Sequence, residues 1–113
     1  MGDSENVIEK CRSLLGILEM YVSKMPREHK FTMGDRIMHR GIMILEETVE
    51  AYYAQRQGKK ERVLRINTHL EVLRQLLRLL FERDFHNLQK HEHFIREMDG
   101  LGRLLGGWAK SLA

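Results

Sequence analysis

The stretch Lys59–Arg83 reads KKERVLRINTHLEVLRQLLRLLFER and decides the fold of the chain. One set of its apolar residues recurs at alternating spacings of three and four, which is the pattern of one face of a long helix. The set consists of Val63, Ile66, Leu70, Leu73, Leu77 and Leu80. Val72, Leu76 and Leu79 widen this apolar arc to about 220°, well beyond the stripe of about 100° that a surface helix needs. The helix therefore needs two neighbours, either inside one bundle or across a subunit boundary.

The length and composition of the chain fit a single folded domain over residues 1–113. Hydrophobic residues make up 42% and charged residues 31%, values that are ordinary for a globular protein and argue against disorder. The chain has one proline and is rich in Leu, Met, Arg, Glu and Lys, which favours long helices over strands.

Helical periodicity divides the chain into four segments, at about 4–24, 32–57, 59–85 and 88–111. The first segment ends before Pro26, because a proline disfavours helical backbone at the residue before it. The second is expected to open at Thr32, where T-M-G-D supplies a hydroxyl cap and an acid three residues later. The connections are short, which suits antiparallel neighbours. We therefore predict an all-α fold, an antiparallel up-down-up-down four-helix bundle.

The fourth segment contains four glycines at Gly100, Gly102, Gly106 and Gly107, each of which disfavours helix by about 1 kcal/mol relative to alanine. Gly102 and Gly106 share one face, where another backbone or a large ring could approach closely. The alternative is a break in the helix at Gly106–Gly107. Because Trp108 continues the apolar phase beyond these glycines, we predict a continuous helix used for close packing.

The only cysteine, Cys11, cannot form an internal disulfide and lies on the apolar face of the first segment, so we expect a small core residue. No N-terminal stretch resembles a signal peptide. No apolar run approaches the ~20 residues needed to span a bilayer. We therefore expect a cytoplasmic protein with no membrane partner.

The positive charge of the chain is unevenly distributed. The net charge is +3, and residues 58–86 alone contain seven Lys or Arg against four Asp or Glu. A basic helix in an otherwise near-neutral chain indicates a polyanionic partner. The alternative is a solvated helix face crossed by ion pairs.

Two arginines of this helix, Arg74 and Arg78, lie four residues apart at the border of the apolar arc. Arginine suits phosphate because its planar guanidinium donates two parallel hydrogen bonds and stays charged. The alternative is an ion pair with the second helix, where three glutamates could serve as partners: Glu46, Glu47 and Glu50.

A second basic group stands near the start of the same helix and consists of Lys59, Lys60, Arg62 and Arg65. Positive side chains are slightly unfavourable at a helix N-terminus, which favours an external role such as contact with a nucleic-acid backbone. Solubility of the loop explains them nearly as well. No aromatic residues are interleaved with these charges, so contacts to RNA, or to DNA, should be to phosphate and not by base stacking.

Two further groups carry weak signals for chemistry. The spacings of His86, His91 and His93 do not match the usual helical metal ligands, so we expect no metal site. Arg62 and His69 have a spacing similar to that of a helical-bundle ribonuclease family, but Val63 stands where that family has a polar residue. There is no glycine-rich phosphate loop and no convincing nucleophile–base pair. We therefore predict no enzymatic activity and no cofactor.

Three short motifs follow one another along the chain. They are MPREHK at Met25–Lys30, LRQLLRLL at Leu73–Leu80 and GRLLGGW at Gly102–Trp108. In this order and spacing they resemble the accessory variability determinant (Avd) proteins of diversity-generating retroelements, over about residues 20 to 112. A more distant resemblance is to the four-helix proteins encoded by intervening sequences in bacterial 23S ribosomal RNA genes.

The resemblance to Avd implies a homopentameric ring of four-helix bundles that binds the element's reverse transcriptase and engages its template RNA. This partnership supports error-prone, adenine-directed copying of a template repeat, and the accessory protein has no catalytic role in it. Arg74 and Arg78 match the arginines of the third-helix motif, which favours a binding role over an ion pair. Two alternatives stay open: a metal-independent ribonuclease, with Arg62 and His69 meeting across a dimer interface, and an intervening-sequence-type bundle.

Overall fold

The computed structural model describes residues 2–112. This part of the chain contains four long helices, one short helix and one π-helical segment, and no strand. In chain order they are α1 (Gly2–Ser23), α2 (Arg27–His29), η1 (Lys30–Gly34), α3 (Asp35–Tyr53), α4 (Lys59–Glu82) and α5 (Leu88–Ser111).

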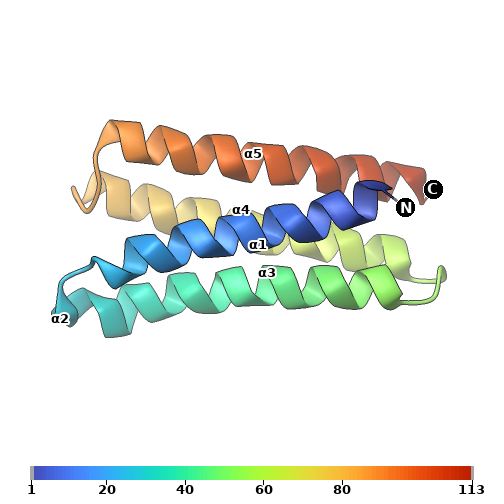
Figure 1. Ribbon diagram of the computed structural model, residues 1–113, viewed down its shortest axis with the longest axis horizontal. Coiled ribbons are helices and arrows are strands. Elements are labelled where there is room, and N and C mark those ends of the chain that lie inside the picture. Colours follow the sequence, from blue (N-terminus) through green and yellow to red (C-terminus); the bar gives the residue numbers. More distant parts are fainter. Residues whose placement is uncertain (1, 113) are drawn as a thin grey trace.

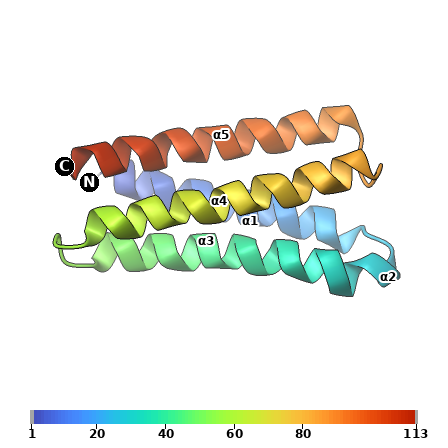
Figure 2. The ribbon, with the colours of Figure 1, turned by 180° about the vertical axis from the view of Figure 1, so that it is seen from behind.

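The four long helices lie side by side and alternate in direction (Figure 1). Each packs against two neighbours, α1 against α3 and α5, and α4 against α3 and α5, so that the four form a square in cross-section. Seen from behind, α4 lies between α3 and α5 over its whole length (Figure 2). The predicted antiparallel four-helix bundle is therefore confirmed for the described residues.

The core lies along the axis of the bundle and receives one row of apolar side chains from each long helix. All six residues of the predicted inner face of α4 are buried. Facing them on α5 is a row at spacings of three and four, consisting of Phe94, Met98, Leu101, Leu105 and Trp108. Periodicity alone thus located the inner row of α4 correctly. Along residues 2–112, no helix is both long and apolar enough to cross a membrane.

Cys11 is a core residue, as predicted, and it is almost fully buried. Its thiol donates to the Oγ1 of Thr48 at 3.3 Å, and Thr48 in turn donates to the carbonyl of Ile44 at 2.7 Å. Burial raises the pKa of the Cys11 thiol to about 11, against the opposing effect of the hydrogen bond with Thr48. These two bonds satisfy the buried hydroxyl of α3 without any contribution from water.

The second long helical stretch begins earlier than predicted. Pro26 has extended backbone, and its carbonyl accepts hydrogen bonds from His29 N (2.9 Å) and Lys30 N (3.0 Å), so helix begins at Arg27. Proline is well suited to a helix start, since its missing N–H has no partner there anyway. Thr32 is not the cap: its hydroxyl bonds back to the carbonyls of Glu28 and His29, inside the π-helical segment η1.

Two predicted helix ends are too long. The helix expected to reach residue 57 ends at Tyr53, because Ala54 is extended and Gly58 takes a left-handed backbone with φ of 81°. The helix expected to reach residue 85 ends at Glu82. There Asp84 is left-handed, with φ of 64°, and the Phe85 amide donates to the Leu80 carbonyl, which is the hydrogen bond of a Schellman motif.

The glycines of α5 differ in how closely other residues approach them. The helix is continuous to Ser111, so the break at Gly106–Gly107 does not occur. A Cβ built on Gly102 would lie 3.5 Å from the Arg74 guanidinium, which shows a close approach at this position. Nothing in the described structure lies within 4 Å of a Cβ at Gly106 or Gly107, so the expected close packing is wrong for Gly106 within one chain.

The packing predicts a large difference between two apolar residues of the same helix. Phe94→Ala should lower the free energy of unfolding by about 3–5 kcal/mol, because it leaves a cavity in the centre of the core. Leu88→Ala should change it by less than about 0.5 kcal/mol, because Leu88 is exposed at the start of α5. Urea denaturation of both variants checks this, and similar losses would show that the described core is misplaced.

Candidate binding groove between α4 and α5

The side chain of Arg74 crosses from α4 to α5 and lies against Gly102. Its NH1 atom is 2.7 Å from the Oδ1 of Asp99 on α5, and its Nε is 3.7 Å from the Oε1 of Glu71. A Cβ added at Gly102 would lie 3.5 Å from the guanidinium, which is ordinary van der Waals contact, so Gly102 lies directly against Arg74. The alternative of an ion pair is therefore found at Arg74, but with Asp99 and not with the predicted glutamates of α3.

Arg78, one turn further along α4, is held much more loosely. Its side chain is 68% exposed, against 27% for Arg74. Its Nε lies 3.3 Å from Glu82 Oε2, an i,i+4 contact within the same helix. Within the described residues, no acid contacts the two terminal nitrogens of Arg78. Of the predicted pair, Arg78 is therefore the one whose guanidinium fork can still bind a ligand.

Both arginines line a groove of about 480 Å³ between α4 and α5. Apolar side chains line part of it, namely Phe81 from α4 and Ile95 and Met98 from α5. Glu71 and Glu82 also line the groove, and these carboxylates offset much of the positive charge. The groove suits an anionic group that enters beside an apolar one.

Aromatic residues form the wall of the groove at the α4–α5 turn. The His91 ring stacks on Phe81 with centroids 4.4 Å apart and planes only 6° apart. Behind it a chain of hydrogen bonds leads to α1: His91 Nδ1 lies 3.1 Å from His86 Nε2, and His86 Nδ1 lies 2.7 Å from the Tyr21 hydroxyl. Residues from three helical segments are thus held together in one cluster.

Both histidines of this cluster have lowered pKa values. Burial is the main cause that lowers the pKa of His86 to about 4, and the nearby His91 and the positive charge of Lys90 contribute to the same shift. Burial also lowers the pKa of His91; nearby Arg78 adds to this effect and Glu82 opposes it. Both imidazoles are therefore neutral at pH 7, and they act as hydrogen-bonding and stacking groups.

The second predicted basic group lies at the opposite end of α4. Lys59 Nζ donates to the Tyr52 carbonyl at 3.1 Å, so this lysine satisfies the C-terminal end of α3. Lys60, Arg62 and Arg65 are exposed. Sixteen residues separate Arg62 from Arg78, which is about 24 Å along a helix and about 160° around its axis. The basic residues of α4 therefore form two separate surfaces and not one continuous stripe.

The residues of the ribonuclease alternative do not meet within one chain. His69 points from α4 toward α3, where Arg40 NH1 lies 2.6 Å from its Nδ1 and Glu47 Oε2 lies 2.6 Å from its Nε2. The contact with Glu47 is close but poorly directed for a hydrogen bond. Arg62 is exposed and takes no part in this cluster. A cross-dimer pairing of Arg62 with His69 stays a prediction, and it would have to compete with both partners on α3.

The three histidines near the α4–α5 turn separate into a pair and a single residue. His86 and His91 are hydrogen-bonded to each other, whereas His93 lines a different surface hollow. Among the described residues, no three His, Cys, Asp or Glu side chains are grouped closely enough to hold a metal ion.

Sequence reasoning missed the two residues of α5 that lie against Arg74 beside the groove, Asp99 and Gly102. Both are on α5 at a spacing of three, so they share one side of the helix, and that side faces Arg74. The sequence did contain a signal for this contact. Arg74 lies four residues after Leu70 and four before Arg78, so it stands beside the buried row, on the side of α4 that faces α5. The partner helix, however, could only be identified once the handedness of the bundle was known.

The comparisons identify one family. The family model described as bAvd-like matches residues 7–112, which is nearly the whole described chain. The comparisons with curated proteins and with solved structures gave no match.

The histidine cluster predicts loss of stability in acid. In the unfolded chain a histidine has its ordinary pKa near 6.5, whereas folding lowers the pKa of His86 to about 4. Between these values the unfolded chain binds more protons, so the free energy of unfolding should fall as the pH falls through this window. Denaturation at about pH 7 and about pH 5 measures the loss.

Two variants separate this effect from the titration of carboxyl groups. His86→Gln removes the titrating ring and should show a smaller loss between the two pH values. His39→Gln removes an exposed imidazole of α3 and should keep the loss of the unmodified protein. Equal losses in all three proteins would show that the cluster does not resist protonation.

Proposed function

Since the chain belongs to the bAvd-like family, we propose that it is a non-catalytic accessory protein of a diversity-generating retroelement. In this role it binds the element's reverse transcriptase and template RNA and supports mutagenic copying of the template repeat. No step of the chemistry is assigned to its own side chains. Its contribution is to hold polymerase and RNA together.

The observation that carries the proposal is that residues of two sequence motifs meet at Arg74, which lines the groove. Arg74 and Arg78 come from the motif LRQLLRLL, and Gly102 comes from the motif GRLLGGW, 28 residues beyond Arg74 in the chain. Gly102 lies against the Arg74 guanidinium, and Asp99 pairs with it. This contact between two motifs, beside a groove that Arg74 lines, favours a shared binding site over two separate needs of the fold.

The two arginines have different roles in this proposal. Arg74 is a positioning residue: its bond to Asp99 leaves it little freedom to bind a ligand, and it shapes the groove between α4 and α5. Arg78 is the ligand-binding residue, because its side chain is largely exposed and its guanidinium stays charged. A phosphate of RNA or a carboxylate of the polymerase would suit its planar fork equally.

The surface with Lys60, Arg62 and Arg65 is proposed to contact the RNA backbone. It has no acidic contacts among the ion pairs of the described residues. The contribution of this surface to RNA binding should be electrostatic, and it should weaken as the salt concentration rises. Because the net charge of the chain is only +3, RNA binding by the protein alone should be weak and should strengthen when the polymerase is present.

Assembly into a homopentameric ring is part of the proposal. The apolar arc of α4 extends beyond the core: Leu79 is exposed, and Val72 and Leu76 are half-buried. Leu64, outside this arc, is exposed as well. On α3, Ile42 is also exposed. Neighbouring subunits would cover these side chains and so supply the second interface that the breadth of this arc requires.

Arg78→Ala should weaken association with the reverse transcriptase or its RNA without changing stability, because its side chain is exposed. For RNA, loss of one phosphate contact should reduce the slope of affinity against salt by about one unit. Co-purification with the reverse transcriptase and RNA binding at several salt concentrations measure the two effects.

The matched control is Arg12→Ala, which removes an exposed arginine of α1, away from the groove. It should bind as the unmodified protein does. Arg74→Ala should lower stability as well as binding, since it leaves Asp99 without its partner. If Arg78→Ala and Arg12→Ala bind equally well, Arg78 is not the ligand-binding residue.

The native mass of the purified protein tests the ring. Five chains of 13.4 kDa should sediment or scatter as one stable assembly. Leu79→Glu should dissociate this assembly into smaller species while circular dichroism stays helical, because Leu79 is outside the core. A monomer or dimer of the unmodified protein would contradict the ring and leave the ribonuclease and intervening-sequence-type alternatives to be tested next.

A further inference from the structure

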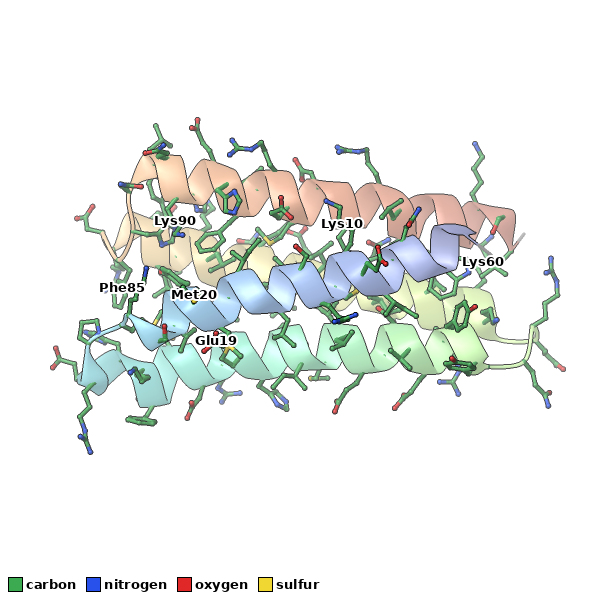
Figure 3. All side chains as sticks on the ribbon, viewed as in Figure 1. Lys10, Glu19, Met20, Lys60, Phe85 and Lys90 are labelled. Carbon is green, nitrogen blue, oxygen red and sulfur yellow. The ribbon has the colours of Figure 1, made fainter. Side chains whose placement is uncertain are left out.

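A second hollow lies at the end of the bundle where α1 meets the α4–α5 turn. Its volume is about 290 Å³. Most of its lining is apolar and comes from two stretches far apart in the chain, 20–26 and 85–90, with Met20, Tyr21, Met25, Pro26 and Phe85 as the main residues. Figure 3 shows Met20 of α1 and Lys90 of α5 on two sides of this region, with Phe85 at the end of the bundle. We call it the end hollow.

Internal contacts hold the walls of the end hollow in place. The hydrogen bond of 2.7 Å between the Tyr21 hydroxyl and His86 joins α1 to the α4–α5 turn. On the other side, the His29 ring meets Phe85 edge-on with centroids 4.7 Å apart, so that α2 braces the same turn. The hollow is therefore preformed, and a ligand would not have to order it on binding.

Large apolar side chains are unusually exposed at this end of the bundle. Three of the four most exposed in the described chain are here, namely Phe31 (62%), Leu88 (58%) and Met20 (54%). Pro26 lines both the end hollow and a neighbouring depression that contains Phe31 and Arg27. Phe31 itself belongs to the π-helical segment η1, a rare geometry that often marks functional sites.

The charged side chains that line the end hollow are both basic. Lys24 and Lys90 line it, no acid does, and neither lysine takes part in an ion pair in the described structure. The closest acid on α1, Glu19, lies on the side toward α3 in Figure 3. Glu28, in the neighbouring depression, contacts His29 at 3.6 Å. Two lysines beside an apolar floor are complementary to a ligand that is both apolar and acidic.

We propose that the end hollow is a docking site for a segment of a partner protein in which a large apolar side chain stands beside Asp or Glu. The apolar side chain would rest on Met20, Met25 and Pro26, and the carboxylates would meet Lys24 and Lys90. This site is separate from the groove with Arg78 and does not depend on the proposed function. A nucleic acid fits less well, because the two aromatic residues among the main lining residues already have ring partners: Tyr21 meets His86 edge-on and Phe85 meets His29 edge-on.

The test uses the full-length protein with ¹³C-methyl methionine and two tripeptides of equal size. Acetyl-Asp-Phe-Glu-amide should shift the methyl signals of Met20 and Met25 in a saturable way at millimolar concentrations. Acetyl-Lys-Phe-Lys-amide should not shift them. The double variant Lys24→Glu with Lys90→Glu should weaken binding of the acidic tripeptide by about tenfold or more. Both lysines are exposed, so this variant should fold normally.

The control variant is Arg12→Glu with Lys110→Glu, which makes the same change in net charge at exposed positions outside the hollow. It should bind the acidic tripeptide as the unmodified protein does. Equal shifts with both tripeptides, no saturable shift of Met20 and Met25, or equal weakening in the two double variants would each overturn the proposal. So would tighter binding of a uridine oligonucleotide at the same methyl signals, since that would assign the hollow to nucleic acid.

Discussion

Burial of α4 on two sides is the constraint on which the rest of the bundle depends. Its inner row from Val63 to Leu80 supplies the centre of the core, while its flanks contact α3 through His69 and α5 through Arg74. A helix placed in this way fixes the positions of both neighbours. The two polar contacts on its flanks then set the register, because each requires a particular residue on the facing helix.

Periodicity predicted the helices well and their ends poorly. The inner row of α4 was correct because burial of an apolar stripe depends only on spacing along one helix. The ends at Tyr53 and Glu82 depend instead on turn geometry, in which Gly58 and Asp84 adopt left-handed backbone. The early start at Arg27 was missed because a hydroxyl three residues before an acid has the same pattern whether it caps a helix or bonds back within one.

The site was harder to predict than the fold for a related reason. A single sequence shows that Arg74 and Arg78 are four residues apart, but not which helix each faces. Asp99 holds the first and leaves the second exposed, a difference that comes from the arrangement of four helices in space. The same arrangement separates Arg62 and Arg65 from the groove, although all four arginines belong to one helix. Charge along a sequence therefore could not show that the basic residues of α4 lie on two separate surfaces.

The buried thiol of Cys11 also makes the protein convenient for site-directed labelling. Alkylating reagents and spin labels react with exposed thiolate, and this single cysteine is almost fully buried with its pKa raised to about 11. A cysteine introduced on the outside of any helix would therefore react selectively, with the native one left in place. Distances between labelled helices, or between labelled chains, can thus be measured without first replacing a core residue that donates to Thr48.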